Sequence, residues 1–319
     1  MSMQDVKVKD LKREYDKTFV PSAVYLNSMP DLQNSGFAGI PIDMVGIHDF
    51  KMPLYVKTKQ DGLRQITASI SGTVSLDANS RGINMSRIIR TFYKSGNIEF
   101  DINELEKVLK NYQKDLNTFE SNILMNFEYP LWQPALRSLN GNGDREGGWQ
   151  YYNITFDTHL DSSGRFRKVL WLDFVYSSAC PCSTALSEHA ALMRGVYGIP
   201  HSQRSVARIG IEFDDMVWIE DVIDWCRTAL KTETLVFCKR QDEQAFAELN
   251  GANVKFVEDA IRLLADELNK HDNVIDYKII CSHLESLHSH NAISVLTKGL
   301  PNSKFANNIT VDELKSLVR

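Results

Sequence analysis

The stretch that decides the fold is DSSGRFRKVLWLDFVYSSA, residues 161–179, because it places a turn and then a strand in the middle of the chain. Residues 161–164 are the small and polar types that form tight turns. Residues 168–179 are largely apolar, aromatic and β-branched, which predicts a strand. Strand-like and helix-like segments follow one another in the same order on both sides of this turn. The sequence therefore predicts two copies of one structural unit.

Periodicity gives the elements of each unit. The expected elements of the first half are strands at 45–58 and 65–78, helices starting at 84 and 101, and strands at 119–132 and 148–160. Those of the second half are strands at 168–179 and 203–213, helices at 218–230 and 253–269, and strands at 276–284 and 288–298. Asn253 is the expected N-cap of its helix.

Each half therefore reads β-β-α-α-β-β. The predicted fold class is α+β, with two tandem modules built on antiparallel sheets. Residues 1–41 are expected to form an N-terminal arm, residues 42–161 the first module and residues 162–319 the second module. The second module holds the candidate site described below.

Composition and net charge exclude some classes of function. The chain has 319 residues and a net charge of -5, which argues against general nucleic-acid or membrane-surface binding. Residues 1–19 mix charges and lack the apolar core of a signal peptide, and no apolar run reaches the roughly 18 residues of a membrane span. Five scattered cysteines in such a chain predict reduced thiols and a cytoplasmic location. Of these, Cys226, Cys238 and Cys281 are expected to be buried or idle.

Two thiols and an imidazole mark the first chemical motif. Cys180 and Cys182 flank Pro181, and His201 opens a polar run after them. If proline keeps this segment extended, both thiols face the same side. Such a cluster suggests either a nucleophile with its base or two ligands of a transition metal. The C-x-C spacing does not distinguish a nucleophile with its base from a pair of metal ligands.

Further donors follow in the same module. His288 and His290 would share a face of a strand, although two surface histidines are a plain alternative. Glu243 lies in a polar segment between two helices, where solvated loop charges are the simpler interpretation. Glu258 lies near the start of a helix, where it would either stabilise the helix dipole or accept N1–H and the exocyclic NH₂ of a guanine. A thiolate, imidazole and carboxylate set with one open position is typical of a catalytic metal site.

Five motifs in order make the chain resemble a known family. They are CPCS at 180–183, HSQRS at 201–205, KRQDEQ at 239–244, FVED at 256–259 and ESLHSHNA at 285–292. PDLQNS at 30–35 and SLDANSRGINMSR at 75–87 extend the resemblance over most of the chain. It resembles the type IB GTP cyclohydrolase I family. The resemblance implies the tunnelling fold (T-fold) and a homotetramer with active sites at subunit interfaces.

The resemblance also implies the reaction and the site. Cys180, His201, Glu243 and His288 would bind a divalent transition metal, for which zinc, manganese and ferrous iron all suit the ligand set. Glu258 would anchor the purine and Arg204 would meet the triphosphate, whereas His290 and Cys182 fall on neighbouring catalytic positions. GTP and water would give 7,8-dihydroneopterin triphosphate and formate, the first step of pterin and tetrahydrofolate synthesis.

The chain departs from the family's pattern at two places, and three alternative functions stay open. Residues 185–199 contain an insertion that would form a short helix or lid, and Asn84 replaces a histidine of the family's pattern. The alternatives are a related nitrile reductase that uses a cysteine nucleophile, a metal-binding scaffold without catalysis, and a cyclohydrolase that forms a cyclic phosphate.

Overall fold

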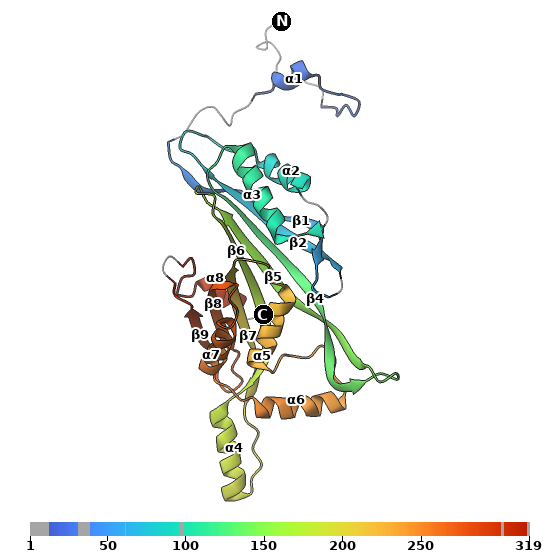
Figure 1. Cartoon of the computed structure of the whole chain (residues 1–319), viewed down its shortest axis with the longest axis vertical. Coiled ribbons are helices and arrows are strands. Elements are labelled where there is room, and N and C mark those ends of the chain that lie inside the picture. The colour runs from blue at the N-terminus through green and yellow to red at the C-terminus, as the bar shows by residue number, and fades with distance from the viewer. Residues whose placement is uncertain (1–12, 31–38, 61, 96–98, 301–302, 318–319) are drawn as a thin grey trace.

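The strands of the chain form one continuous sheet. The computed structural model describes residues 13–30, 39–60, 62–95, 99–300 and 303–317, so parts of the expected N-terminal arm and nearly all of the PDLQNS motif lie outside the described residues. The sheet has nine strands in the order β3-β1-β2-β4-β5-β6-β7-β8-β9 (Figure 1). All neighbouring pairs are antiparallel except the short β1–β3 pair.

The two predicted halves follow one another along this sheet. The first comprises β1 (Ile42–Lys57), β2 (Leu63–Leu76), α2 (Met85–Ser95), β3 (Glu99–Phe100), α3 (Ile102–Leu116), β4 (Ser121–Leu139) and β5 (Arg145–Leu160). The second comprises β6 (Phe166–Ala179), α4 (Pro181–Arg194), β7 (Ser202–Phe213), α5 (Ile219–Leu230), α6 (Arg240–Ala252), α7 (Val257–Leu268), β8 (Val274–His283) and β9 (Ala292–Thr297). Short helices α1 (Ala23–Asn27) and α8 (Val311–Ser316) flank them. The α+β prediction and the repeated order are confirmed.

The turn between the halves forms as its composition predicts. Asp161 Oδ1 accepts hydrogen bonds from the backbone N–H groups of Ser163 and Arg165 at 2.8 and 3.0 Å. Gly164 adopts a φ of 85°, which favours glycine. The tight turn lets β5 pair with β6 from Leu160↔Phe166 onward, so the sheets of the two halves become one.

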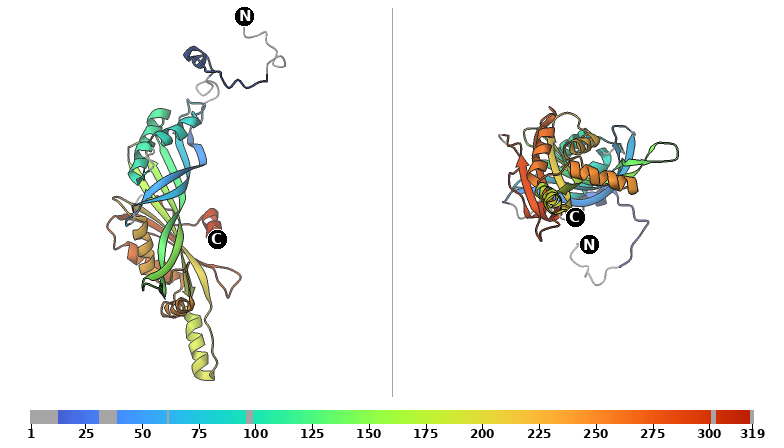
Figure 2. Two further views of the ribbon diagram at one scale, coloured as in Figure 1. Left: turned by 90° about the vertical axis from the view of Figure 1, so that its right-hand side faces the viewer. Right: turned by 90° about the horizontal axis from the view of Figure 1, so that it is seen from below.

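Helices cover one face of the sheet. Leu105, Leu109 and Tyr112 of α3 are buried against the first half, and Ile223 of α5 and Leu264 of α7 are buried against the second. Along β7, alternate residues such as Ala207 and Ile209 meet these helices, whereas Arg208 points to the opposite face, where it meets Ser316 of α8. Figure 2 shows α8 on the far side of the sheet from α5 and α7.

Three local predictions are wrong, each for a physical reason. Pro181 begins α4 instead of keeping the thiols extended, because a proline at the first helical position has no N–H to satisfy. The polar segment after Cys238 forms helix α6 instead of a loop. Asn253 ends α6, and Phe256 is the N-cap of α7, where Asp259 Oδ2 accepts its N–H at 2.9 Å.

One buried carboxylate fixes the start of α6 to the β4–β5 hairpin. Asp242 accepts hydrogen bonds from the backbone N–H groups of Arg137, Ser138 and Lys239 at 2.7, 2.9 and 2.9 Å, and from the Ser138 hydroxyl. Burial alone raises the pKa of this carboxyl, but these hydrogen bonds outweigh burial and hold the pKa well below the ordinary 3.8.

We expect Asp242→Asn to lower the melting temperature at neutral pH by roughly 3 to 8 °C, because an amide nitrogen would face backbone donors. The stabilisation from a depressed pKa is complete above the ordinary value of 3.8 and is lost as the pH falls through the lower folded pKa. Thermal denaturation of both proteins from pH 7 to pH 3 should therefore show a difference that narrows only below about pH 4. A constant difference across this range would contradict the assignment.

The described part of the chain contains no helix that is both long and apolar enough to cross a membrane.

Candidate metal and purine site

The end of β6 and the start of β7 bring the first two candidate donors together. Ala179 pairs with Ser202 in the sheet, and the Cys180 N–H donates to the His201 carbonyl at 3.2 Å. The Cys180 backbone is still extended, with φ of -73° and ψ of 124°, although the helix starts at the next residue. Cys180 and His201 are 21 residues apart in sequence, but the pairing of β6 with β7 brings them together. The connection between them contains α4.

A hollow of about 290 Å³ lies beside this pair, at the N-terminal end of α7. We call it the Cys180 pocket. The polar residues that line it are Cys180, His201, Gln203, Lys255, Glu258, His283, Glu285, His288 and His290. Five of the eight predicted site residues therefore line one hollow, and their roles remain predictions.

The two loop histidines approach one another without a strand. Residues 284–291 form bends before β9, so the predicted strand geometry of His288 and His290 is wrong. Their rings nevertheless stack with centroids 4.9 Å apart and planes 12° apart. Both side chains are exposed, as is Glu258, so this side of the Cys180 pocket is open in the single chain.

Hydrogen bonds hold the ring of His201. Its Nδ1 lies 3.2 Å from Gln203 Oε1, an amide oxygen that can only accept. Nδ1 is therefore the protonated nitrogen in this contact, and Nε2 keeps its lone pair for a ligand. Gln203 Nε2 in turn donates to Ser178 Oγ at 2.9 Å, which fixes the amide orientation.

This network continues into the core. Ser178 Oγ lies 3.3 Å from Nδ1 of the buried His283, whose Nε2 lies 3.0 Å from the Tyr176 hydroxyl. Burial, helped by the nearby Lys255 charge, lowers the pKa of His283 to about 4. His283 is thus neutral near pH 7, and both of its ring nitrogens are already engaged.

Glu285 is the group that sequence reasoning missed. Its Oε2 lies 3.5 Å from His201 Nδ1, is buried and makes no hydrogen bond. It lies on the Nδ1 side of the ring, away from Nε2, which is where a carboxylate orients a metal-binding imidazole. The only sequence signal was its place three residues before His288 in ESLHSHNA.

The other three predicted residues lie elsewhere. Glu243 and Arg204 line a separate hollow of about 370 Å³, which we call the Glu243 pocket. Alternation along β7 explains this, because Arg204 points to the face opposite His201 and Gln203. Cys182 is exposed on α4 and lines neither pocket.

The insertion is confirmed as a helix. Figure 1 shows α4 extending away from the body of the chain, and none of its residues is buried. Among the three thiols expected to be buried or idle, Cys226 and Cys281 are buried, whereas Cys238 is exposed beside the Glu243 pocket.

Within the residues that the structure describes, no three histidine, cysteine or acidic side chains lie close enough to hold a metal ion as they stand. The donor set of the Cys180 pocket still suits one, because it combines a thiol with imidazoles, and the buried carboxylate of Glu285 lies beside one of these imidazoles. These side chains line one hollow, but their ligand atoms are not grouped around a single metal position.

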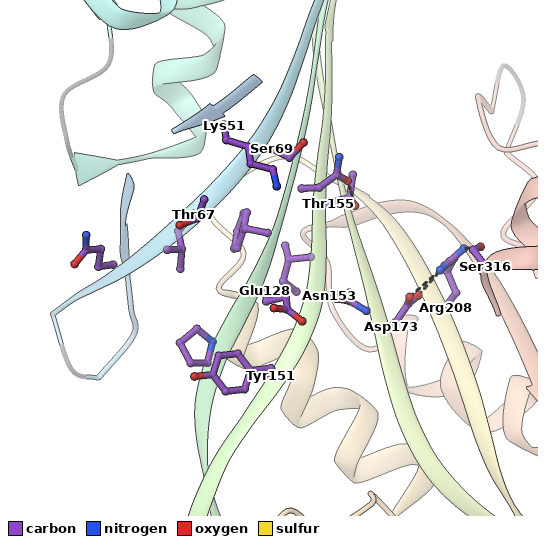
Figure 3. A pocket seen from close by; sticks show the side chains of 16 residues that line it. Lys51, Thr67, Ser69, Glu128, Tyr151, Asn153, Thr155, Asp173, Arg208 and Ser316 are labelled. Carbon is purple, nitrogen blue, oxygen red and sulfur yellow. Dashed lines mark hydrogen bonds and ion pairs between the residues drawn. The ribbon is translucent and has the colours of Figure 1, made fainter. Parts of the chain in front are cut away.

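A larger hollow than the Cys180 pocket offers different chemistry. It measures about 760 Å³ and lies on the face of the sheet opposite α5 and α7, where Ser316 of α8 lines it (Figure 3). Neither cysteine nor histidine lines it. Its two carboxylates include Asp173, which is held by Arg208 through bonds of 2.6 and 2.7 Å. It is therefore not the candidate catalytic site.

Comparison with known proteins agrees with this geometry. The uricase from Arthrobacter globiformis is similar in structure, with a TM-score of 0.52 at 9% identity over 83% of this chain and 96% of that one. A nine-stranded sheet backed by helices, with a thiol and imidazole pocket at its edge, thus defines a tunnelling-fold protein with a candidate metal and purine site.

The sequence comparisons are more specific. A family model described as type I GTP cyclohydrolase folE2 matches residues 29–294, and the chain belongs to this family. The protein named GTP cyclohydrolase FolE2 from Cereibacter sphaeroides is 46% identical over 297 residues, which cover 91% of this chain and 81% of that relative. The protein of the same name from Paracoccus denitrificans is 45% identical over 295 residues, covering 91% and 90%.

Proposed function

We propose that the protein is a GTP cyclohydrolase I of the type IB subgroup, which converts GTP and water to 7,8-dihydroneopterin triphosphate and formate. The observation that carries this proposal is the 46% identity to a named GTP cyclohydrolase across 91% of the chain. The Cys180 pocket supports it, since it gathers metal-type donors and the Glu258 carboxylate in one hollow.

We further propose that the Cys180 pocket holds a divalent transition metal, with zinc, manganese and ferrous iron as candidates. Cys180, His201 and His288 are its proposed ligands in this chain, and Glu243 completes the set. Glu285 would orient His201 from the Nδ1 side of the ring. The ion would supply Lewis acidity that activates a water molecule for attack at C8 of guanine. Gln203 would keep His201 in the tautomer whose Nε2 is free to bind.

The remaining roles follow from position. Glu258 would accept N1–H and the NH₂ group of guanine, and His290, stacked on His288, would exchange a proton with the opening ring. Arg204 would meet a phosphate group, and Cys182 stays a candidate catalytic neighbour. We place the protein in the cytoplasm, where its five unpaired thiols would stay reduced.

The test is direct. Metal-loaded protein is incubated with GTP, and formate and a fluorescent oxidised pterin are measured, with and without a chelator. Formate and pterin that disappear on chelation support the proposal. Mass spectrometry separates a triphosphate product from a cyclic phosphate. Oxidation of NADPH with a nitrile substrate, without formate from GTP, would favour the reductase alternative instead.

The two carboxylates can be distinguished. We expect Glu285→Gln to lower metal affinity by roughly 10- to 100-fold, because Glu285 is the acidic group that lies beside His201 in the same chain. Glu243→Gln is the matched variant for comparison. It should lower metal affinity only if the Glu243 carboxylate of another subunit reaches the Cys180 pocket. Metal content after dialysis measures both. If only Glu243→Gln loses metal, Glu285 does not support His201 in metal binding.

We propose a homotetramer whose active sites lie at subunit interfaces. Glu243 and Arg204 lie in a different pocket from Cys180, and Glu258, His288 and His290 are exposed in the single chain. β9 has only β8 as its neighbour, which leaves an edge for pairing with another chain. We expect light scattering to give four times the 36.3 kDa chain mass. Full activity of a monomer at assay dilution would contradict this.

A further inference from the structure

Lys255 is a buried cation in the Cys180 pocket that the proposed reaction has not yet used. Only 4% of the residue is exposed, although it lies in the short connection between α6 and α7. Its backbone N–H donates to the Ala179 carbonyl at 3.2 Å, which holds it next to Cys180. Lys255 lines the same hollow as Glu258, which follows three residues later in the sequence.

Within the described residues, the Lys255 ammonium group has one more N–H than its hydrogen-bond acceptors use. Nζ donates to the Asn253 carbonyl at 2.5 Å and to Thr232 Oγ1 at 3.2 Å, and a lysine ammonium carries three N–H groups. Neither partner is charged. Burial, together with the charge of Lys231, lowers the pKa of Lys255 to about 8, so the group is still mostly charged at neutral pH.

A buried charge of this kind is costly unless it meets a partner. His283 lines the same hollow, but its two ring nitrogens are occupied by Ser178 and Tyr176. Lys255 is therefore the buried donor that this wall of the pocket offers to a bound molecule.

The chemistry of guanine matches this pairing of groups. Its N1–H and NH₂ are donors that suit Glu258, and O6, which is next to N1, is an acceptor that needs a donor. Adenine and 2,6-diaminopurine carry an amino group at that position, which would face the ammonium group donor to donor. A site that must satisfy a buried hydrogen bond rejects a ligand lacking the matching atom.

We infer that Lys255 binds O6 of the guanine ring and that it is the residue which selects guanine over 6-amino purines. This inference rests on the proposed function. Two residues would then recognise the purine edge: Glu258 would accept hydrogen bonds from N1–H and NH₂, and Lys255 would donate one to O6.

The test measures binding without turnover. In 7-deaza-GTP a carbon replaces N7, so the ring lacks the amidine that the reaction opens, while O6, N1–H and NH₂ remain. Its 6-thio counterpart, which serves as the O6-free ligand, keeps N1–H and NH₂ and replaces O6 with sulfur, a much weaker acceptor. Calorimetric titration of the metal-loaded protein with both ligands gives their affinity ratio, which we expect to exceed roughly 10 for the unaltered protein.

Lys255→Met keeps the length and apolar stem but removes the donor. We expect it to weaken 7-deaza-GTP binding by roughly 10-fold or more and to change binding of the O6-free ligand by less than about 3-fold. Lys231→Met is the matched control, because it removes a neighbouring exposed charge that does not line the pocket, and the affinity ratio should persist. Melting temperatures are recorded for all samples.

The outcomes are separable. If the unaltered protein binds neither ligand, the proposed function fails. If it binds both equally, no donor reads O6 and the inference about Lys255 fails, whether or not Lys255→Met folds. A folded Lys255→Met protein that keeps the affinity ratio, or that loses both ligands by the same factor, would also overturn it.

Discussion

The Cys180→Ala variant is expected to lose nearly all GTP turnover and most of its bound metal. Cys180 lies at the junction of β6 and α4, where its extended backbone and its hydrogen bond to the His201 carbonyl hold it against the second proposed ligand. Loss of a group that only supports a metal ligand typically costs 10- to 100-fold in affinity, so loss of a ligand should cost more than about 100-fold. Metal content and formate production are measured on the same samples.

A matched thiol gives the control. Cys226 is on the buried face of α5 and lies outside the Cys180 pocket, so Cys226→Ala should keep metal and turnover and lose only some stability. Equal loss of activity in the two variants would remove the distinction between a ligand and a packing thiol. A metal-free Cys180→Ala protein with normal turnover would exclude the metal mechanism itself.

The second large effect concerns Glu258→Gln, which should weaken GTP binding by at least about tenfold. The substitution keeps the shape of the side chain but turns an acceptor atom into an NH₂ group that faces a guanine donor. Leaving a hydrogen-bonding group unpaired costs about 1 to 3 kcal/mol, and more when a charge is involved. Because Glu258 is exposed in the single chain, the full effect is expected only in the assembled protein.

The alternative role of Glu258 predicts the reverse pattern. Glu258 lies in the first turn of α7, where a carboxylate stabilises the helix by a few tenths to about 1 kcal/mol through the dipole. If that is its only role, GTP affinity stays unchanged and thermal stability falls slightly. Asp259→Asn is the control: Asp259 caps α7, so this variant should lose stability and keep GTP binding.

The order of strands and helices could be predicted because it depends on local patterns. Alternating apolar residues in β2 and the apolar stripe of α3 each bury one face, and this requirement is visible in sequence. The capping errors were of a different kind. Asn253 is a favoured N-cap type, whereas Phe256 is not, and the contact of Asp259 with the Phe256 N–H nevertheless starts α7 at Phe256.

The sequence also identified the Cys180 pocket in outline. Cys180, His201, Glu258, His288 and His290 are distant in sequence but meet in one hollow. Motif order pointed to them, although no local pattern states that they would meet. Pairing of β6 with β7, and the packing of α7 on β8 and β9, bring these side chains together.

By itself, the sequence determined the class of fold, the order of its elements and the family of the protein, because strand alternation, helical stripes and ordered motifs are properties of the chain alone. The tertiary structure decided which donors share a pocket. It placed Glu243 and Arg204 in a different pocket and brought the buried oxygen of Glu285 beside His201. It also buried Lys255 next to Glu258. The physical reason is that burial and unpaired polar atoms depend on contacts between distant segments, which sequence spacing does not encode.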